Sequence, residues 1–432
     1  MKNKFIIKNV VYKKNNEPEI KGGNGKVVFI SSEENNKIYA VKFFKFKKIN
    51  QNERENLKSK ILEEKTFQRY ERLKKEIEFL RYNNINGIIP IVDFKMPDYD
   101  KYKYGNAYYI MPKAEKIDIE ALSIKEKLII ILELAETLKE IHSKGYAHRD
   151  IKPENILKYN GRACFCDFGL VWNKENKNRL THNDERVGPY KILPPELEKV
   201  SKDSNIDFRC SDIYLLAKVL WIYLLGNDDG FRGEYLRNKD KIYIPFYENN
   251  KVTCFEPIHE LLEKATKDKW EERISIDDFI NNIKLQISIL NNSFTGDIKK
   301  LNYLTKSKKM FYSGKIFSKK FSDIDEIYKY IDEIYEGSTM LITQKNMKKT
   351  KTKLSPKTIT KSEKELIMEC KYMSITFEIH MAPLYLEINN NFETFLYLDN
   401  YINTSYKKFS LDNAEVDDSF YLSDSYFIEF AN

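Results

Sequence analysis

Short apolar runs rich in β-branched and aromatic residues characterise the first 111 residues of the chain. Such runs, bounded by polar and glycine positions, predict strands. The stretch 52–82 differs, because apolar residues recur there every three or four positions with charges between them, which predicts an amphipathic helix. The expected strands are 5–12, 17–30, 38–46, 88–94 and 107–111, the second of them broken by glycines. Strands with short connections indicate an antiparallel sheet.

Helical periodicity replaces the strand pattern after residue 115. Helices are expected at 125–143, 211–225, 257–266 and 276–289. The second of these is apolar on nearly every side, which is typical of a buried helix. A β-rich part followed by a helical part predicts an α+β fold with two lobes, about 1–111 and about 115–292.

The pattern changes again at a polar stretch around residues 291–296. Beyond it we predict a separate C-terminal domain of mixed α/β structure at 297–432, after a first domain at 1–292. Its helix is expected at 322–336 and its strands at 340–343, 372–380, 384–388 and 420–430. The stretch 344–364 is rich in lysine and threonine and predicts an exposed loop.

Composition limits the class of protein. The chain has 432 residues, of which 42% are hydrophobic, enough for two or three folded domains rather than global disorder. It lacks an 18-residue apolar run, so no membrane span is expected, and its first residues do not resemble a signal peptide. Five cysteines favour a reducing, cytoplasmic location. The net charge of +8 is mild for this length, and no nucleic-acid partner is expected.

Two motifs carry the chemistry. The sequence HRDIKPEN occupies residues 148–155, and DFG follows at 167–169. Either DFG or a short fragment of the first motif would be weak alone, but the octapeptide at this distance before DFG is highly specific. Together they resemble the catalytic loop and magnesium motif of the eukaryotic-type protein kinase family. The resemblance covers about residues 5–290 and implies a bilobal kinase fold.

The resemblance assigns roles in phosphoryl transfer to four residues. Asp150 would orient the attacking hydroxyl and accept its proton, and Lys152 would neutralise charge on the transferred phosphate. Asn155 and Asp167 would supply oxygen ligands to Mg²⁺, a hard cation that prefers them. The resemblance therefore implies ATP and Mg²⁺ as cofactors, with Asp150, Lys152 and Asn155 as catalytic residues.

The nucleotide site is expected between the predicted sheet and the catalytic loop. By resemblance, Lys42 would hold the α- and β-phosphates and pair with Glu76, for which Glu78 is the competing choice. The sequence GGNGKV at 22–27 resembles the glycine-rich loop, whose backbone N–H groups approach phosphate closely. It departs from the family pattern at Ile20, where a glycine is usual. The other expected contacts are Gly22, Gly23, Gly25, Val27 and Ala40, with Met111 as gatekeeper and Pro112 to Ala114 facing adenine.

Further positions match structural parts of the family. Glu196, in a Pro-Pro-Glu sequence, would form a buried ion pair with Arg273, and Asp212 would brace the catalytic loop. Arg149 would bind a negative group on the activation segment. Three interpretations stay open for this segment: the built-in acids Asp184 or Glu185, a phosphorylated Thr181, or merely solvated residues.

The preferred acceptor is a Ser/Thr hydroxyl of a protein substrate, because Lys152 follows the Ser/Thr pattern. Pro189 is instead typical of tyrosine kinases, so tyrosine or dual specificity stays an alternative. A second alternative is a pseudokinase or ATP-binding scaffold in which the C-terminal domain binds a partner or acts as a sensor. A small-molecule kinase is disfavoured, because the segment through Glu196 builds a peptide platform. The composition, heavy in Lys, Asn and Ile, looks like a bacterial member with an AT-rich genome.

Overall fold

The computed structural model describes the following residues: 4–7, 10–15, 17–22, 25–34, 36–45, 57–97, 106–175, 191–198, 206–237, 239, 241–244, 247–248, 251–252, 254–291, 293, 318–334, 339–344, 352–354, 356–372, 375–389, 394–407, 419–422 and 426–431. The chain divides into two compact units. The first comprises Met1–Tyr235 and Glu260–Ile287, and the second Leu236–His259 and Ser288–Asn432. The domain limits expected from the sequence stay a prediction. Among the described helices, none is long and apolar enough to cross a membrane.

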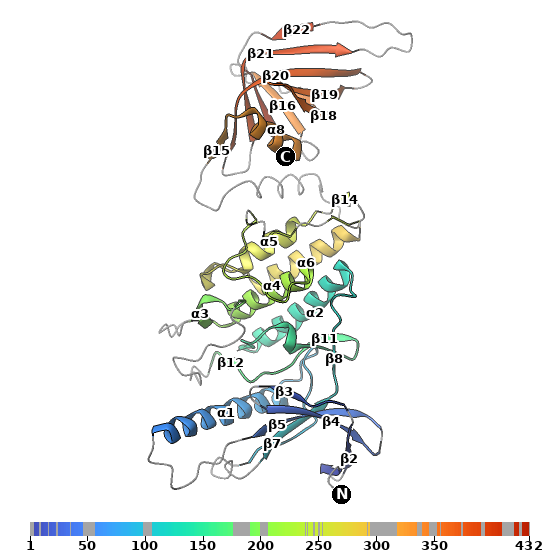
Figure 1. The fold of residues 1–432 in the computed structure, drawn as a ribbon, viewed down its shortest axis with the longest axis vertical. Helices are drawn as coiled ribbons and strands as arrows, with labels where there is room; N and C mark the ends of the chain where they lie inside the picture. The colour runs from blue at the N-terminus through green and yellow to red at the C-terminus, as the bar shows by residue number, and fades with distance from the viewer. Residues whose placement is uncertain are drawn as a thin grey trace. The chain divides into compact units, whose positions relative to one another are not determined.

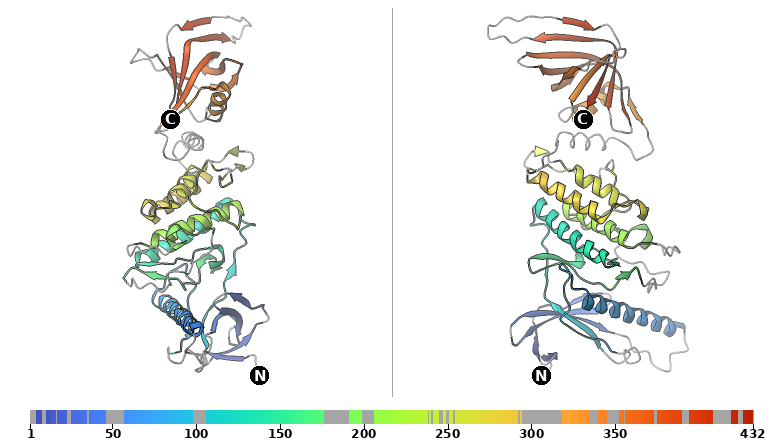
Figure 2. Two further views of the ribbon diagram at one scale, coloured as in Figure 1. Left: turned by 60° about the vertical axis from the view of Figure 1, so that its left-hand side comes forward. Right: turned by 180° about the vertical axis from the view of Figure 1, so that it is seen from behind.

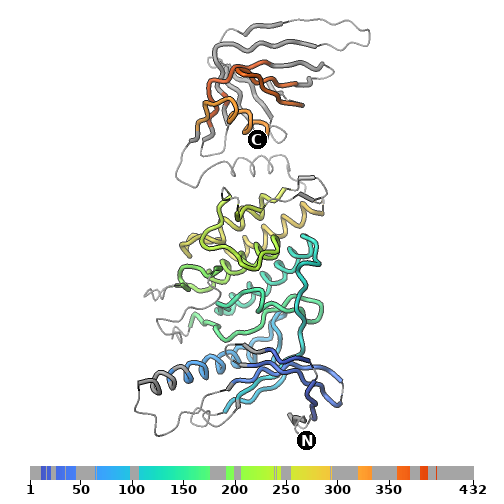
Figure 3. The backbone as a smooth tube through the Cα atoms, viewed as in Figure 1, coloured from blue at the N-terminus to red at the C-terminus, as the bar shows by residue number. Residues whose placement is uncertain are grey.

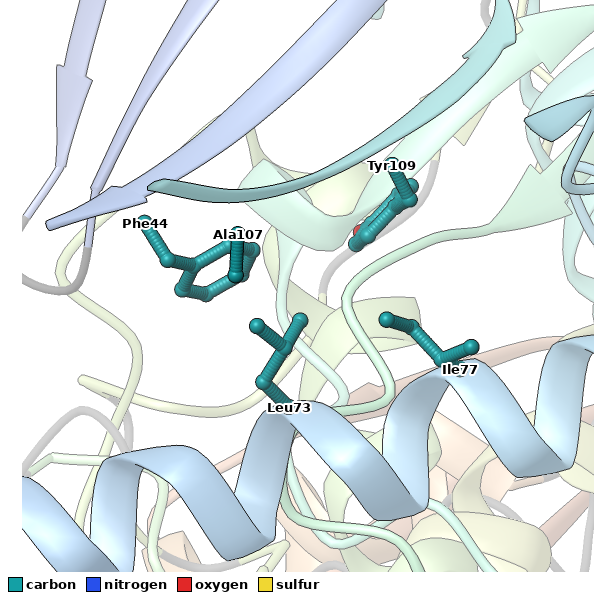
Figure 4. Close-up of a cluster of buried hydrophobic side chains, with 5 residues drawn as sticks. All are labelled: Phe44, Leu73, Ile77, Ala107 and Tyr109. Atoms are coloured by element: carbon teal, nitrogen blue, oxygen red, sulfur yellow. The ribbon is translucent and has the colours of Figure 1, made fainter. Parts of the chain in front are cut away.

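The first unit begins with an antiparallel sheet, which the described residues form from seven strands in the order β1-β2-β4-β5-β7-β6, with β3 paired to β4. The strands are β1 Lys4–Ile7, β2 Val10–Lys14, β3 Ile20–Gly22, β4 Gly25–Ser32, β5 Ile38–Lys45, β6 Asp93–Lys95 and β7 Asn106–Pro112. Helix α1, Leu57–Tyr82, runs along the sheet (Figure 1; Figure 2). Leu73 and Ile77 of the helix pack on Phe44, Ala107 and Tyr109 of the sheet (Figure 4). This apolar contact fixes α1 against the sheet.

Two strand predictions in this sheet need correction. The expected strand 5–12 is a hairpin, with β1 and β2 paired from Phe5 opposite Tyr12 to Ile7 opposite Val10. Of the expected strand 88–94, only its end belongs to a strand, β6, while Ile88 makes a single bridge to Phe165. Pro90 interrupts the run because proline lacks a backbone N–H for strand pairing. Ile88 and Ile89 of the run are apolar because their side chains are buried in the core, not because they belong to a sheet.

The helical part of the first unit follows the predicted pattern. Helices α2 and α4 lie side by side, as the backbone trace shows (Figure 3). The helices are α2 Ile124–Ser143, α3 Pro195–Glu198, α4 Arg209–Leu225, α5 Glu256–Ala265, whose first residues belong to the second unit, and α6 Ile276–Leu290. Ser123 and Glu126 form a capping box at the start of α2. Gly226, with φ of 63°, ends α4, whose side chains are buried on all sides as expected.

One short strand precedes α2, and further short strands lie between α2 and α4. A 3-10 turn at Pro153–Asn155 lies within this segment. The described residues pair β10 with both β11 and β8, and β9 with β12. Their bounds are β8 Glu115–Lys116, β9 Tyr146–Ala147, β10 Ile156–Tyr159, β11 Arg162–Phe165 and β12 Trp172–Asn173. Both sequence motifs therefore lie in loops that short strands anchor on either side.

In the second unit, the described residues after 317 form a nine-stranded antiparallel sheet and one helix, α8, Ile324–Ile334. The strands are β15 Ser318–Phe321, β16 Thr339–Gln344, β17 Thr352–Leu354, β18 Pro356–Lys361, β19 Leu366–Tyr372, β20 Ile375–Asn389, β21 Thr394–Lys407, β22 Ser419–Leu422 and β23 Tyr426–Ala431. The expected strands 372–380 and 384–388 merge into β20, whose register shifts around Pro383. A short hairpin of β13, Tyr247–Glu248, and β14, Lys251–Val252, precedes α5.

The exposed loop expected at 344–364 is wrong for most of its described residues, because β17 and β18 lie there. They form the two ends of the main strand order. In β18, Ile359 is buried while Thr358 and Thr360 are exposed, which is the alternation of a strand with one covered face. Lysines and threonines on an edge strand hinder pairing with other chains, so their abundance reflects an edge rather than a loop.

We expect Gly87→Ala to destabilise the first unit strongly. Gly87 has φ of 102°, and a Cβ there would lie 2.0 Å from Thr137 Oγ1 on α2. The strained backbone costs roughly 1–3 kcal/mol and the overpacking about as much again. Since each kcal/mol lowers Tm by about 2–4 °C in a unit of this size, Tm should fall by at least about 4 °C in differential scanning fluorimetry.

The control for this change is Gly161→Ala. Gly161 also has positive φ, 79°, but a Cβ there would meet nothing within 4 Å. It carries the backbone strain without the overpacking, so it should lower Tm by only about half as much as Gly87→Ala. Equal shifts for the two variants would contradict the proposed clash between residue 87 and Thr137.

Candidate active site

A cleft of about 1440 Å³ lies between the seven-stranded sheet and the helical part of the first unit. It is larger than the usual small-molecule pocket, so it has room for a nucleotide and part of a second substrate. The following predicted site residues line it: Val27, Ala40, Lys42, Glu76, Met111, Pro112, Ala114, Asp150, Lys152, Asn155 and Asp167. The fold thus brings together residues that are more than a hundred positions apart in the sequence.

Lys42 of β5 lies between two carboxylates. Its Nζ is 3.2 Å from Glu76 Oε1 of α1 and 2.9 Å from Asp167 Oδ1 of the DFG segment. The pair expected between Lys42 and Glu76 is therefore present, and Glu78, the competing choice, is exposed. An ammonium group has three donors, so Lys42 keeps one for a further acceptor in the cleft.

Charge and burial set the ionisation of this group. Burial works to lower the pKa of Lys42, but the charges of Glu76 and Asp167 outweigh it and hold the pKa well above its usual range. Burial also works to raise the pKa of Asp167, but Lys42 overcomes it and the pKa lies below the ordinary value. Lys42 is therefore a cation and Asp167 an anion at neutral pH.

In the catalytic loop, two side chains contact the carboxylate of Asp150. Lys152 Nζ lies 3.0 and 2.8 Å from the two oxygens of Asp150. Asn155 Nδ2 donates to both the backbone carbonyl and Oδ2 of Asp150, each at 2.8 Å. Because Asn155 uses its amide nitrogen here, its carbonyl oxygen is left to act as a ligand. The turn at Pro153–Asn155 brings the three residues this close.

The carboxylate of Asp212 on α4 binds the backbone of the catalytic loop. Asp212 accepts from the backbone N–H of His148 at 2.8 Å and of Arg149 at 2.7 Å, and His142 Nε2 lies 3.0 Å from it. Asp212 thus satisfies backbone donors that would otherwise be buried without a partner. Arg149 has φ of 67°, an unfavourable conformation for a non-glycine residue, and these bonds hold it there. The bracing expected of Asp212 is present.

His148 links the two motifs. Its Nδ1 accepts from the backbone N–H of Asp150 at 3.2 Å, so the proton sits on Nε2, which donates to the carbonyl of Cys166 at 3.2 Å. Burial lowers the pKa of His148, which keeps this neutral tautomer. The rings of His148 and Phe79 both lie 4.5 Å from the ring of Phe168, measured between centroids. These contacts fix the DFG segment against both α1 and the catalytic loop.

The part of the cleft where adenine is expected is lined by residues of β4, β5 and the end of β7. Ala40 is opposite Met111 in the β5–β7 register, and Pro112 ends β7. The backbone of Gly22 pairs with Gly25 at the ends of β3 and β4. Gly23, between them, lies outside the described residues, as do Thr181, Asp184, Glu185 and Pro189 of the activation segment. The three interpretations for that segment stay predictions, and Arg149 stacks its guanidinium 4.4 Å from the ring of Phe208.

The buried pair expected between Glu196 and Arg273 is present. Arg273 Nη1 and Nη2 donate to the two carboxylate oxygens of Glu196 at 2.6 and 2.9 Å. Ser211 Oγ donates to the same carboxylate at 2.7 Å, and Arg273 also donates to the carbonyl of Cys210. All the charge is therefore hydrogen-bonded, which a buried ion pair requires. The pair joins α3 to the turn before α6.

Sequence reasoning missed one polar group in the site, Tyr109. Its hydroxyl donates to Glu76 Oε1 at 2.8 Å from a fully buried position on β7. The alternation in 106–112 assigns Tyr109 to the same face as Met111, but it does not say that the hydroxyl reaches α1. The signal that could have found it is a tyrosine two positions before Met111, on a strand expected in the same sheet as Lys42.

The donors fit a magnesium ion. Among the described residues, no cluster of three or more His, Cys, Asp or Glu side chains is arranged for a metal. The candidate ligands are instead one carboxylate, Asp167, and one amide oxygen, that of Asn155. Oxygen donors of this kind suit a hard cation, which keeps its remaining positions for water and phosphate.

A comparison with protein-family models identifies the chain. Residues 20–283, more than half of the chain, match the model of the protein kinase domain. The chain belongs to the protein kinase family. The geometry described above is thus that of a kinase cleft.

Several kinases of known name are similar to this one. Serine/threonine-protein kinase chk1 of Schizosaccharomyces pombe is 35% identical over 27% of this chain and 23% of its own. Serine/threonine-protein kinase PknH of Mycobacterium tuberculosis is 30% identical over 36% of this chain and 24% of its own. Calcium-dependent protein kinase 5 of Plasmodium falciparum is 24% identical over 66% of this chain and 52% of its own. This kinase thus matches about a quarter of the length of the first two relatives and about half of the third.

We expect Glu196→Gln to destabilise this kinase much more than Glu198→Gln. Both residues lie on α3, but Arg273 is fully buried beside Glu196, whereas Arg232 beside Glu198 is 59% exposed. Breaking one side of a buried pair costs about 3–5 kcal/mol, and an exposed pair contributes about 0–1 kcal/mol. Thermal unfolding of the two variants measures the difference.

The expected fall in Tm is about 10 °C for Glu196→Gln and less than about 4 °C for Glu198→Gln. Similar midpoints would mean that Arg273 finds other partners and that its pair with Glu196 is dispensable.

Proposed function

We propose that this kinase is an ATP- and magnesium-dependent enzyme that transfers the γ-phosphate of ATP to Ser/Thr hydroxyls of protein substrates, itself included. One observation carries the proposal. Lys152 and Asn155 converge on the Asp150 carboxylate in the same cleft where Lys42 meets Asp167. This arrangement has the three parts that phosphoryl transfer requires: a base for the hydroxyl, a cation beside the transferred phosphate, and a cation with a carboxylate at the nucleotide phosphates.

Asp150 is the residue that takes the hydroxyl proton. Its carboxylate is largely buried but faces the cleft, and its two oxygens are already oriented by Lys152 and Asn155. A hydroxyl that enters beside Asp150 donates its hydrogen bond to an oriented acceptor, which lines up its oxygen for attack. Lys152, half-buried beside the same carboxylate, then faces the phosphate as negative charge shifts onto it.

The nucleotide end relies on Lys42 and Asp167. Lys42 offers its remaining donor to the phosphates while Glu76 and Asp167 keep it charged and in place. Mg²⁺ bound by Asp167 and Asn155 would neutralise the phosphate oxygens and so favour transfer. Met111, Pro112 and Ala114 would bound the adenine, since they line the same cleft.

Two features support Ser/Thr over Tyr as the acceptor. Lys152 is a lysine that contacts the catalytic carboxylate directly, as the Ser/Thr pattern has it. The relatives chk1 and PknH carry serine/threonine-protein kinase in their names. Acid hydrolysis of the autophosphorylated protein, followed by phosphoamino-acid separation, distinguishes the two acceptors.

We expect Asp150→Asn and Asp167→Asn to abolish transfer in different ways. Asp150→Asn removes the proton acceptor but leaves the nucleotide end intact, so kcat should fall at least about a hundredfold with little change in ATP affinity. Asp167→Asn removes a charge that acts on the phosphates, so it should weaken binding of ATP with Mg²⁺ as well as kcat. Initial rates and calorimetric titration measure the two quantities.

The control is Glu175→Gln, since Glu175 is exposed and lies outside the cleft in the segment that follows DFG. It should leave both quantities unchanged. A kcat within about tenfold of wild type in Asp150→Asn or Asp167→Asn, with Tm unchanged, would overturn the assignment.

A further inference from the structure

Tyr109 lies on β7 directly opposite Lys42 on β5. Its ring belongs to the apolar cluster that joins the sheet to α1, where it faces Ile77 (Figure 4). The neighbouring Tyr108 points to the other face of the sheet, against the ring of Phe43. A tyrosine buried in an otherwise apolar cluster needs a partner for its hydroxyl, because an unpaired buried hydroxyl is costly.

The partner is the carboxylate of Glu76, which is 1% exposed. Its Oε1 accepts from three donors: the Tyr109 hydroxyl at 2.8 Å, the backbone N–H of Phe168 at 3.1 Å and Lys42 Nζ at 3.2 Å. The hydroxyl gives the shortest of the three distances. Two of the three donors, the Tyr109 hydroxyl and the Phe168 N–H, are neutral groups, and neither is expected to contact the nucleotide.

Lys42 is a shared partner, because Asp167 lies 2.9 Å from the same ammonium. A nucleotide phosphate would be a further acceptor for Lys42, and a carboxylate as deeply buried as Glu76 depends on all of its donors. The ring of Tyr109 fixes its hydroxyl to the central sheet, so this hydrogen-bond donor does not depend on the position of the Lys42 ammonium. The hydrogen bond from Tyr109 to Glu76 therefore links β7 to α1 independently of Lys42.

We propose that Tyr109 is a positioning residue that keeps Glu76 docked against the sheet, so that Lys42 stays aligned for phosphoryl transfer. The proposal rests on the proposed kinase activity and extends it to a residue outside the motifs. Burial raises the pKa of Glu76, and the charge of Lys42 and the hydrogen bond from Tyr109 both oppose that rise. Burial also raises the pKa of Tyr109 well above its usual value, so the hydroxyl keeps its proton and remains a donor.

The test is Tyr109→Phe, with Tyr108→Phe as the matched control on the opposite face of the same strand. A hydrogen bond to a charged group contributes about 1.5–3 kcal/mol, so we expect kcat to fall at least about tenfold in Tyr109→Phe. KM for ATP should change less than about threefold, because the adenine contacts remain. Tyr108→Phe should stay within about twofold of wild type in both constants.

A double-mutant cycle separates positioning from packing. If the hydroxyl acts through the Glu76 carboxylate, Tyr109→Phe should add less than about a twofold change in kcat in a Glu76→Gln background. If it only packs, the same loss appears in both backgrounds, and the proposal is wrong. Phenylalanine keeps the ring in the cluster and removes only the hydrogen bond, so Tm of Tyr109→Phe should fall by no more than several degrees.

Hydrogen–deuterium exchange of the full chain without nucleotide gives a readout that does not depend on activity. Exchange in peptides from α1 should be faster in Tyr109→Phe than in wild type and unchanged in Tyr108→Phe. If wild type transfers no phosphate, the proposed function fails while this measurement still decides the docking role of Tyr109. Unchanged α1 exchange together with kcat within about twofold would overturn the inference.

Discussion

A single buried carboxylate oxygen, Glu76 Oε1, ties together the parts of the first unit on which the site depends. It receives Lys42 from β5, Tyr109 from β7 and the backbone N–H of Phe168 from the DFG segment. Helix α1, which carries Glu76, also contacts the sheet through apolar side chains and through Arg81 over the ring of Phe94, which are less directional than hydrogen bonds. The directional bonds to Glu76 set the rotation of α1 and place Asp167 beside Lys42. The positions of Lys42 and Asp167 in the cleft depend on this oxygen.

The catalytic loop is held in strained conformations that its surroundings maintain. Arg149 and Asp167 both have positive φ, at 67° and 62°. Such conformations cost about 1–3 kcal/mol each and persist only where neighbouring bonds fix them. Asp212 fixes the backbone at Arg149, and Lys42 fixes the side chain of Asp167. The strain places the two carboxylates, Asp150 and Asp167, on the wall of one cleft. Rigid α4, buried along its length, supplies the base for this arrangement.

Motifs and long periodic segments could be predicted from the sequence, because they depend on local spacing. The strand at 38–46, the helix at 125–143 and the buried helix at 211–225 are confirmed, and so is the family of the chain. The structure also contains the expected pairs of Lys42 with Glu76 and of Glu196 with Arg273. The catalytic and nucleotide-binding roles of the site residues stay predictions.

What could not be predicted depends on tertiary context. In the run at 88–94, Ile88 and Ile89 are apolar because they are buried, while only the end of the run pairs as a strand, and local pattern does not separate the two causes. The lysine-rich stretch at 344–364 is expected from its sequence to be a loop, because edge strands and exposed loops have similar polar compositions. Tyr109 is invisible to motif reasoning, because its partner lies on another element and the distance between them is set only by folding.

Two ion pairs of this kinase differ in whether their charged groups can exchange one partner for another. The Arg273 and Glu196 side chains are 0% and 5% exposed, and their donors and acceptors are filled by each other and by fixed backbone and side-chain groups. Lys42 and Asp167 are 13% and 44% exposed, and they face a cleft large enough for a nucleotide. A buried, fully satisfied pair has no low-energy alternative, whereas a pair at the cleft can trade an acceptor for a phosphate at small cost. Stability and chemistry are therefore assigned to different pairs, while Glu76 takes part in both, since Tyr109 donates to it from the sheet and Lys42 keeps a further donor for the cleft.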